Sequence, residues 1–158
     1  MVKIYLYYTL KMTVNKKWIE ENYIKFNHCY FNDLLPPIGV GRMHIQLLDI
    51  NKPVNYLGRA QWHLTSPNGC DNICNREYSI KINNYYSDLY EVEFQNVLLH
   101  EMIHIWQYIM GYKGGHGTSF KKKAKEINEF GWGITSEYED KYIKGNKNDK
   151  RKGEIFFR

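Results

Sequence analysis

Cysteine is scarce in this chain of 158 residues, and no hydrophobic run is long. Its three cysteines are too few, and odd in number, for the disulfide framework of a small secreted domain. No apolar run approaches the roughly 20 residues that cross a bilayer. No cleavage site of small residues follows the apolar start of the chain. We therefore expect a cytoplasmic protein with no membrane segment.

The chain also lacks internal repeats, and a length of 158 residues favours one domain with one core. Residues 141–158 hold seven Lys or Arg against two Asp or Glu, which accounts for the whole net charge of +5. We predict an appendage over 1–12, a domain over 13–140 and a basic tail over 141–158. A basic tail can contact phosphates or can simply be solvated, and both alternatives stay open.

Apolar residues recur at helical spacing from Thr13 to about Asp33, with Thr13 or Asn15 as the N-cap and Pro36-Pro37 as the stop. Three strand-like runs follow, over 41–50, 57–65 and 76–83. Residues 91–111 are apolar in nearly every helical direction, which is typical of a helix buried in the middle of a domain. A further helix is predicted over 118–130. This order predicts an α+β domain with a small three-stranded antiparallel sheet.

The predicted buried helix carries the motif H-E-x-x-H, formed by His100, Glu101 and His104. Residues four apart lie on nearly the same face, so two imidazoles can hold one zinc ion from one side. Glu101 projects about 100° round the helix, where it can reach a water on the metal. His116 is the candidate third ligand, because a catalytic zinc usually has three protein ligands and one water.

His116 can reach the metal only if the helix stops. A continued helix would place it about 18 Å beyond His104. We predict that the chain turns back at Gly114-Gly115, which brings His116 just before the next helix. The alternative is that these polar groups are satisfied by hydrogen bonds in the core. Burying two histidines and a carboxylate on an otherwise apolar helix is costly unless something binds them, which favours the metal site.

The segment HEMIHIWQY, followed by GHGTSF, resembles the SprT/Spartan-like zinc metallopeptidases, which pair H-E-M-x-H with a downstream H-G-x-x-F. The segments YFNDLLPPI, LGRAQW and YSIKIN are similar to further parts of that family, so the resemblance spans roughly Val14 to Phe130. It implies that His100, His104 and His116 hold Zn²⁺ and that Glu101 is the catalytic base. It implies an endopeptidase acting on protein substrates. DNA-associated proteins are a further candidate class of substrate, which the resemblance alone does not imply.

In such an enzyme zinc activates a water and polarises the scissile carbonyl. Glu101 takes the water's proton and can return it to the leaving amine. The longer bacterial members of the family often carry a C-terminal zinc ribbon with paired cysteines. This sequence has no counterpart, because no cysteine follows Cys74. Two residues are candidate partners for the oxyanion, Tyr112 and His63.

Several other residues have two interpretations. Gln107 could orient the His104 imidazole, although an ordinary polar helix residue is the preferred interpretation. Cys70 and Cys74 could begin a second metal site, but without a matching pair two free thiols in a loop are favoured. Cys29 is predicted to be a helix core residue. The histidines outside the motif are expected to be structural or exposed. They are His28, His44 and His63.

Lysines after His116 are predicted to form the solvated side of the last helix. They are Lys121, Lys122, Lys123 and Lys125. DNA is a candidate partner through Lys121, Lys122, Lys125 and the basic tail. Trp62, Trp106 and Trp132 could stack on unpaired bases or lie in the core.

The alternative function is a zinc-containing DNA-binding module without catalytic turnover. A third possibility is a metallopeptidase of another H-E-x-x-H clan. His116 follows His104 by 12 positions, which disfavours the metzincins, in which the third histidine follows the second by six. The sequence does not fix the oligomeric state.

Overall fold

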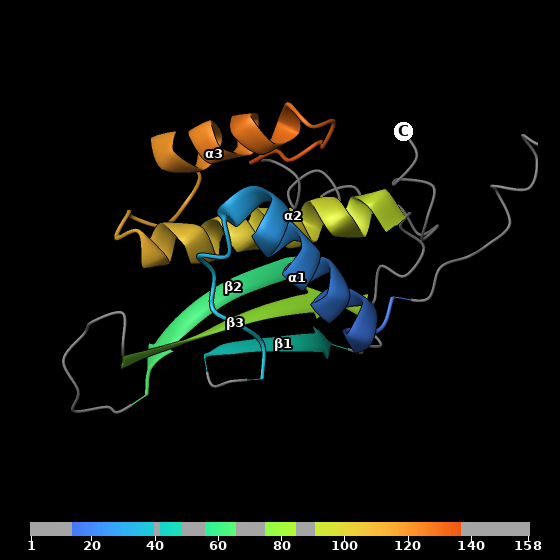
Figure 1. The fold of residues 1–158 in the computed structure, drawn as a ribbon, viewed down its shortest axis with the longest axis vertical. Helices are drawn as coiled ribbons and strands as arrows, with labels where there is room; N and C mark the ends of the chain where they lie inside the picture. The colour runs from blue at the N-terminus through green and yellow to red at the C-terminus, as the bar shows by residue number, and fades with distance from the viewer. Residues whose placement is uncertain (1–13, 40–41, 49–55, 66–74, 85–90, 137–158) are drawn as a thin grey trace, which may run out of the picture.

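The structure is a computed structural model that describes residues 14–39, 42–48, 56–65, 75–84 and 91–136. The predicted appendage, the basic tail and the loop with Cys70 and Cys74 lie outside the described residues. The α+β class is confirmed (Figure 1). The elements in chain order are α1 (Lys16–Phe31), β1 (Met43–Leu48), β2 (Gly58–Leu64), β3 (Arg76–Asn83), α2 (Glu91–Ile109) and α3 (Thr118–Asn128).

The sheet is mixed, so the predicted purely antiparallel sheet is wrong. The strand order is β1-β3-β2, with β1 parallel to β3 and β2 antiparallel to it. Alternation of buried residues, as at Tyr78, Ile80 and Ile82, shows which face a strand buries but not the direction of its neighbour. β2 is an outer strand, and no described strand pairs with its other flank.

Helix α1 begins where the sequence predicted and ends earlier. The Asn15 side chain accepts a hydrogen bond from the backbone N–H of Trp18 at 2.9 Å, which confirms Asn15 as the N-cap. The helix ends at Phe31 because Asn32 and Asp33 adopt positive φ, ahead of the two prolines. Cys29 is exposed, so its prediction as a core residue is wrong. It lies away from the face that buries Ile19, Tyr23 and Phe26.

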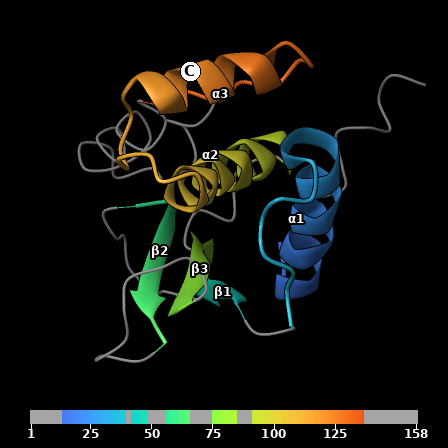
Figure 2. The same ribbon diagram turned by 60° about the vertical axis from the view of Figure 1, so that its left-hand side comes forward.

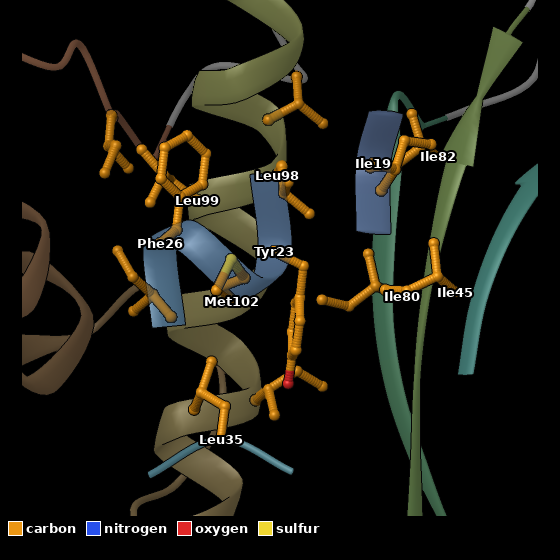
Figure 3. Packing of buried hydrophobic residues seen from close by; sticks show 14 of the residues in the cluster. Ile19, Tyr23, Phe26, Leu35, Ile45, Ile80, Ile82, Leu98, Leu99 and Met102 are labelled. Carbon is orange, nitrogen blue, oxygen red and sulfur yellow. The ribbon is translucent and has the colours of Figure 1, made fainter. Parts of the chain in front are cut away.

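Helix α2 lies between the sheet and α3, with α1 beside it (Figures 1 and 2). Figure 3 shows side chains of α1 and α2 meeting those of the sheet in one core. Leu98, Leu99 and Met102 of α2 are buried, and so is the polar pair His100 and Glu101. The expectation of a helix buried on nearly all sides is therefore confirmed. No described helix is both long and apolar enough to span a bilayer.

Helix α3 packs on α2 through Phe120, Ala124 and Ile127, as predicted. Lys123 is an exception among the lysines predicted to be solvated, because only 7% of it is exposed. Its ammonium lies 2.9 Å from a carboxylate oxygen of Glu126 and 5.5 Å from the centre of the Trp106 ring. The aliphatic stem is thus buried while the charge keeps a partner.

After α3 the chain returns toward α2 over residues 131–136, which we call the return segment. The backbone N–H of Gly133 donates to the side chain of Asn96 at 3.0 Å. The Trp132 indole donates to the Tyr30 hydroxyl at 2.7 Å and packs edge-on against Phe26. These contacts fix the return segment against α1 and α2.

Candidate metal centre

Three imidazoles converge at the junction of α2 and α3. The Nε2 atom of His100 lies 3.2 Å from Nε2 of His104 and 3.0 Å from Nε2 of His116. His100 and His104 are one helical turn apart on α2, while His116 comes from the turn before α3. Gly111 and Gly115 adopt positive φ in that turn, so the predicted reversal of the chain near the glycine pair is confirmed.

The tautomer of His100 follows from the partner of its other ring nitrogen. Nδ1 lies 3.0 Å from the backbone carbonyl oxygen of Thr135 in the return segment. A carbonyl oxygen can only accept, so Nδ1 carries the proton and donates it. The Nε2 atom of the neutral ring is therefore unprotonated, and its lone pair is directed at the other two histidines.

Gln107 fixes the tautomer of His104 in the same way. The Gln107 amide nitrogen donates to the carbonyl oxygen of Gly115 at 3.0 Å and to the Ser119 hydroxyl at 2.8 Å. Its amide oxygen therefore faces Nδ1 of His104, at 2.8 Å, and accepts the proton there. The preferred interpretation of Gln107 as an ordinary polar helix residue is thus wrong. It is fully buried and links α2 to the turn that carries His116.

Burial keeps both α2 histidines neutral. The pKa of His100 is lowered to about 3, first by burial and then by His104 and His116. The pKa of His104 is lowered mainly by burial, although its hydrogen bond with Gln107 acts in the opposite direction. Neutral imidazole is the form that binds a metal.

Phe120 forms the apolar wall behind the three histidines. Its ring centre lies 4.7 Å, 5.1 Å and 4.8 Å from the ring centres of His100, His104 and His116. Phe120 is 1% exposed, so it holds the rings from the protein side and leaves the Nε2 atoms facing the cavity. This residue is the phenylalanine of the H-G-x-x-F segment.

The three Nε2 atoms fit a metal ion. Two neutral imidazoles that both donate through Nδ1 have no proton to share between their Nε2 atoms, so a cation between them would offset the repulsion of the two lone pairs. Tetrahedral zinc with Zn–N bonds of 2.0–2.1 Å separates its nitrogens by about 3.3 Å, close to the spacing observed here. Among the described residues, these three histidines are the cluster that could hold a metal.

Glu101 lies beside the cluster and is 3% exposed. β2 passes close to it at Gly58, which has no side chain. A Cβ at Gly58 would lie 2.9 Å from Cγ and 3.1 Å from Oε1 of Glu101. Gly58 therefore permits the close approach of strand and helix that confines the carboxylate.

A cavity of about 260 Å³ opens on these groups. The three histidines and Glu101 line it together with Gly58, Arg59 and Ala60 of β2 and Tyr108 of α2. The two candidate oxyanion partners are elsewhere. Tyr112 lines a different cavity, and His63 pairs with Glu77 at 3.1 Å, near the far end of β2.

Sequence reasoning missed three contributors to this site. The carbonyl of Thr135 acts through its backbone, which has no sequence signature. Gly58 matters because it has no side chain. Glu101, which lies beside it in the folded structure, is 43 positions further along the chain. Tyr108 did have a signal, since it follows Glu101 by seven residues and so shares its helical face.

The histidines outside the cluster are exposed at their side chains, by 78%, 50% and 63% for His28, His44 and His63. This confirms the expectation that they are structural or exposed, and the structure shows the exposed case for all three.

Comparison with known proteins agrees with this geometry. The model of the SprT-like family matches residues 19–142, which contain every described element except the first turn of α1. No curated protein gives a significant match. Because the match covers most of the sequence and includes the three converging histidines and Glu101, the chain belongs to the SprT-like family.

Proposed function

We propose that this chain is a zinc-dependent endopeptidase in which His100, His104 and His116 hold Zn²⁺ and Glu101 is the general base. One observation carries the proposal: the Nε2 atoms of three histidines face one another in an open cavity beside a buried carboxylate. Family membership supports it independently, because SprT-like proteins include metallopeptidases.

The number of ligands favours catalysis over a structural role. A structural zinc site is closed by four protein ligands, whereas a catalytic site has three and an open position. The described residues supply three histidines to this cluster and no fourth metal-binding side chain. The cavity of about 260 Å³ on the open side leaves room for a peptide group.

The chemistry of peptide hydrolysis can be divided among these groups. When bound, zinc supplies a Lewis acid and lowers the pKa of a coordinated water. Glu101 accepts a proton from the attacking water and gives it to the leaving nitrogen as the C–N bond breaks. Burial of Glu101 and its confinement by Gly58 hold the carboxylate in one place for both transfers.

The test is Glu101→Gln in protein loaded with zinc. The substitution preserves shape and the metal ligands, so we expect full zinc content with no cleavage of an unfolded protein substrate. Glu93→Gln is the matched control, since Glu93 lies two turns earlier on the same helix and outside the cavity. Hydrolysis that persists in Glu101→Gln would reject the role of Glu101 as the base.

A second candidate function, DNA binding, is favoured by a separate cavity of about 580 Å³ between the end of α2 and the start of α3. Trp106 and Tyr112 give it an aromatic wall, with ring centres 5.2 Å apart, and Lys113 and Lys122 border it. Rings next to cations are the combination that binds unpaired bases and their phosphates. Of the lysines proposed for DNA, Lys122 borders this cavity and Lys121 and Lys125 do not.

DNA binding is tested with Lys122→Glu and with Lys121→Glu as the neighbour outside the cavity. Fluorescence anisotropy with a single-stranded oligonucleotide should show a larger loss of affinity for Lys122→Glu, and wild-type binding should weaken with salt. Measuring proteolysis with and without the oligonucleotide separates the two functions. Salt-dependent binding without any cleavage would favour the DNA-binding module over the peptidase.

A further inference from the structure

Tyr108 is placed to contact a substrate bound at the metal centre. It follows Glu101 by seven residues on α2, so the two side chains share a face of the helix two turns apart. Long side chains on a helix lean back toward its N-terminus, which directs the Tyr108 ring toward Glu101 and His104. All three residues line the same cavity.

The hydroxyl of Tyr108 is available as a donor. No described residue forms a hydrogen bond with it. Burial raises the pKa of Tyr108, the negative charge of Glu101 raises it further, and Arg59 acts in the opposite direction. The phenol therefore stays protonated at neutral pH, and its electrostatic coupling to Glu101 and Arg59 places it in the same part of the cavity.

Two contacts restrict where the Tyr108 ring can lie. The ring lies against Gly114, where a Cβ would be 3.0 Å from Cε1 and 3.7 Å from the hydroxyl oxygen. Its backbone carbonyl accepts a hydrogen bond from Arg76 of β3 at 3.2 Å. A donor fixed before the substrate arrives is the kind that stabilises a transition state effectively.

We propose that Tyr108 donates a hydrogen bond to the carbonyl oxygen of the scissile peptide as that oxygen gains negative charge. This inference rests on the proposed peptidase function and adds a catalytic residue to it. The proton stays on the phenol throughout, so Glu101 remains the group that moves protons. Tyr112 and His63 are not needed for this task, because neither lines the cavity.

The experiment compares Tyr108→Phe with Tyr112→Phe in zinc-loaded protein. Removing one donor to an oxyanion lowers kcat by about 10²–10³-fold. We expect that loss in Tyr108→Phe, with KM within a few-fold of wild type and unchanged zinc affinity. Tyr112→Phe keeps the aromatic ring of the separate cavity and should match wild type in kcat and KM for peptide cleavage. A kcat for Tyr108→Phe within a factor of three of wild type would overturn the proposal.

A binding measurement separates this proposal from the peptidase function itself. A phosphonamidate peptide mimics the tetrahedral state, and calorimetry can follow its binding to wild type and to both phenylalanine variants. Tyr108→Phe should bind it at least ten-fold more weakly, whereas Tyr112→Phe should not. If wild type fails to cleave but shows this difference, the peptidase function fails and the contact stands. Equal affinities in all three proteins, or no binding to any, would reject the contact.

Discussion

Gln107 shows how one buried amide can fix the tautomer of a proposed metal ligand, His104. Its amide nitrogen donates hydrogen bonds to Gly115 and Ser119, so its amide oxygen must face His104. That oxygen can only accept, so Nδ1 of His104 carries the proton and Nε2 keeps its lone pair. Gln107 also joins the two chain segments that supply the histidines, because Gly115 directly precedes His116.

Replacing Gln107 with Met should therefore weaken metal binding without removing a ligand. We expect a loss of about 10–100-fold in zinc affinity, the usual effect of losing a group that orients a ligand. Competition with a chromophoric chelator measures it. Gln95→Met is the matched control, because Gln95 lies on the same helix and bonds to Asn22 instead. Equal zinc affinities for both variants would contradict the orienting role.

At the scale of single residues, the sequence predicted the groups with a chemical signature. For His100, Glu101 and His104 this signature is the H-E-x-x-H motif. For His116 it is the glycine pair just before it, which predicts that the helix ends there. The sequence left open whether Gln107 orients His104, because its partners Gly115 and Ser119 come close to it only in the folded turn. The roles of the Thr135 carbonyl and of Gly58 could not be predicted, because each depends on which segment lies beside it in the folded chain.

At the scale of elements, the return segment acts as a support for His100. Asn96, one turn before His100 on α2, accepts from the N–H of Gly133, while Thr135 accepts from His100. Asn128 makes two further hydrogen bonds, both with Ile134 and both at 2.8 Å. The position of the Thr135 carbonyl therefore depends on two asparagines that form no hydrogen bond with the three histidines.

Asn96→Ala tests this support. The N–H of Gly133 loses its partner, which should lower the free energy of unfolding by about 1–3 kcal/mol. The looser return segment should also weaken zinc binding several-fold, although Asn96 forms no hydrogen bond with the three histidines. Urea denaturation and zinc competition provide the two readouts. Asn22→Ala on α1 is the control, and it should lose stability without losing zinc affinity.

Element boundaries were predicted better than element directions. Helix and strand ranges agree to within a few residues, because caps and alternation are local signals. The mixed sheet was missed, since β1 lies beside β3 rather than beside β2, which follows it in sequence. The pairing partner of a strand is a property of the assembled core, as the parallel register of Ile45 with Ile80 illustrates.

For the whole molecule, the buried histidines couple folding to pH when no metal is bound. His100 and His104 have pKa values below the usual 6.5 in the folded chain and regain that value on unfolding. Below pH 6.5 these two histidines bind protons in the unfolded chain but stay neutral in the folded chain. The free energy of unfolding therefore has its full value above pH 6.5 and decreases as the pH falls toward 3.

We expect His100 alone to lower the unfolding free energy of metal-free protein by about 2 kcal/mol between pH 7 and pH 5. Urea denaturation in the presence of a chelator measures this loss. His100→Asn should show a smaller decrease over the same range, whereas His63→Asn, at an exposed position, should match wild type. A wild-type stability that is flat from pH 7 to pH 5 would contradict the burial argument.

The position of β2 at the edge of the described sheet has a consequence for the substrates of the proposed peptidase. This strand borders the cavity at Gly58, and no described strand covers its outer side. A polypeptide that pairs with this edge must have free backbone N–H and C=O groups, which folded proteins keep paired or shielded. Such an enzyme would select substrate proteins by how often they unfold locally. Each additional 1.4 kcal/mol in the free energy of local opening of a substrate would prolong its lifetime about ten-fold.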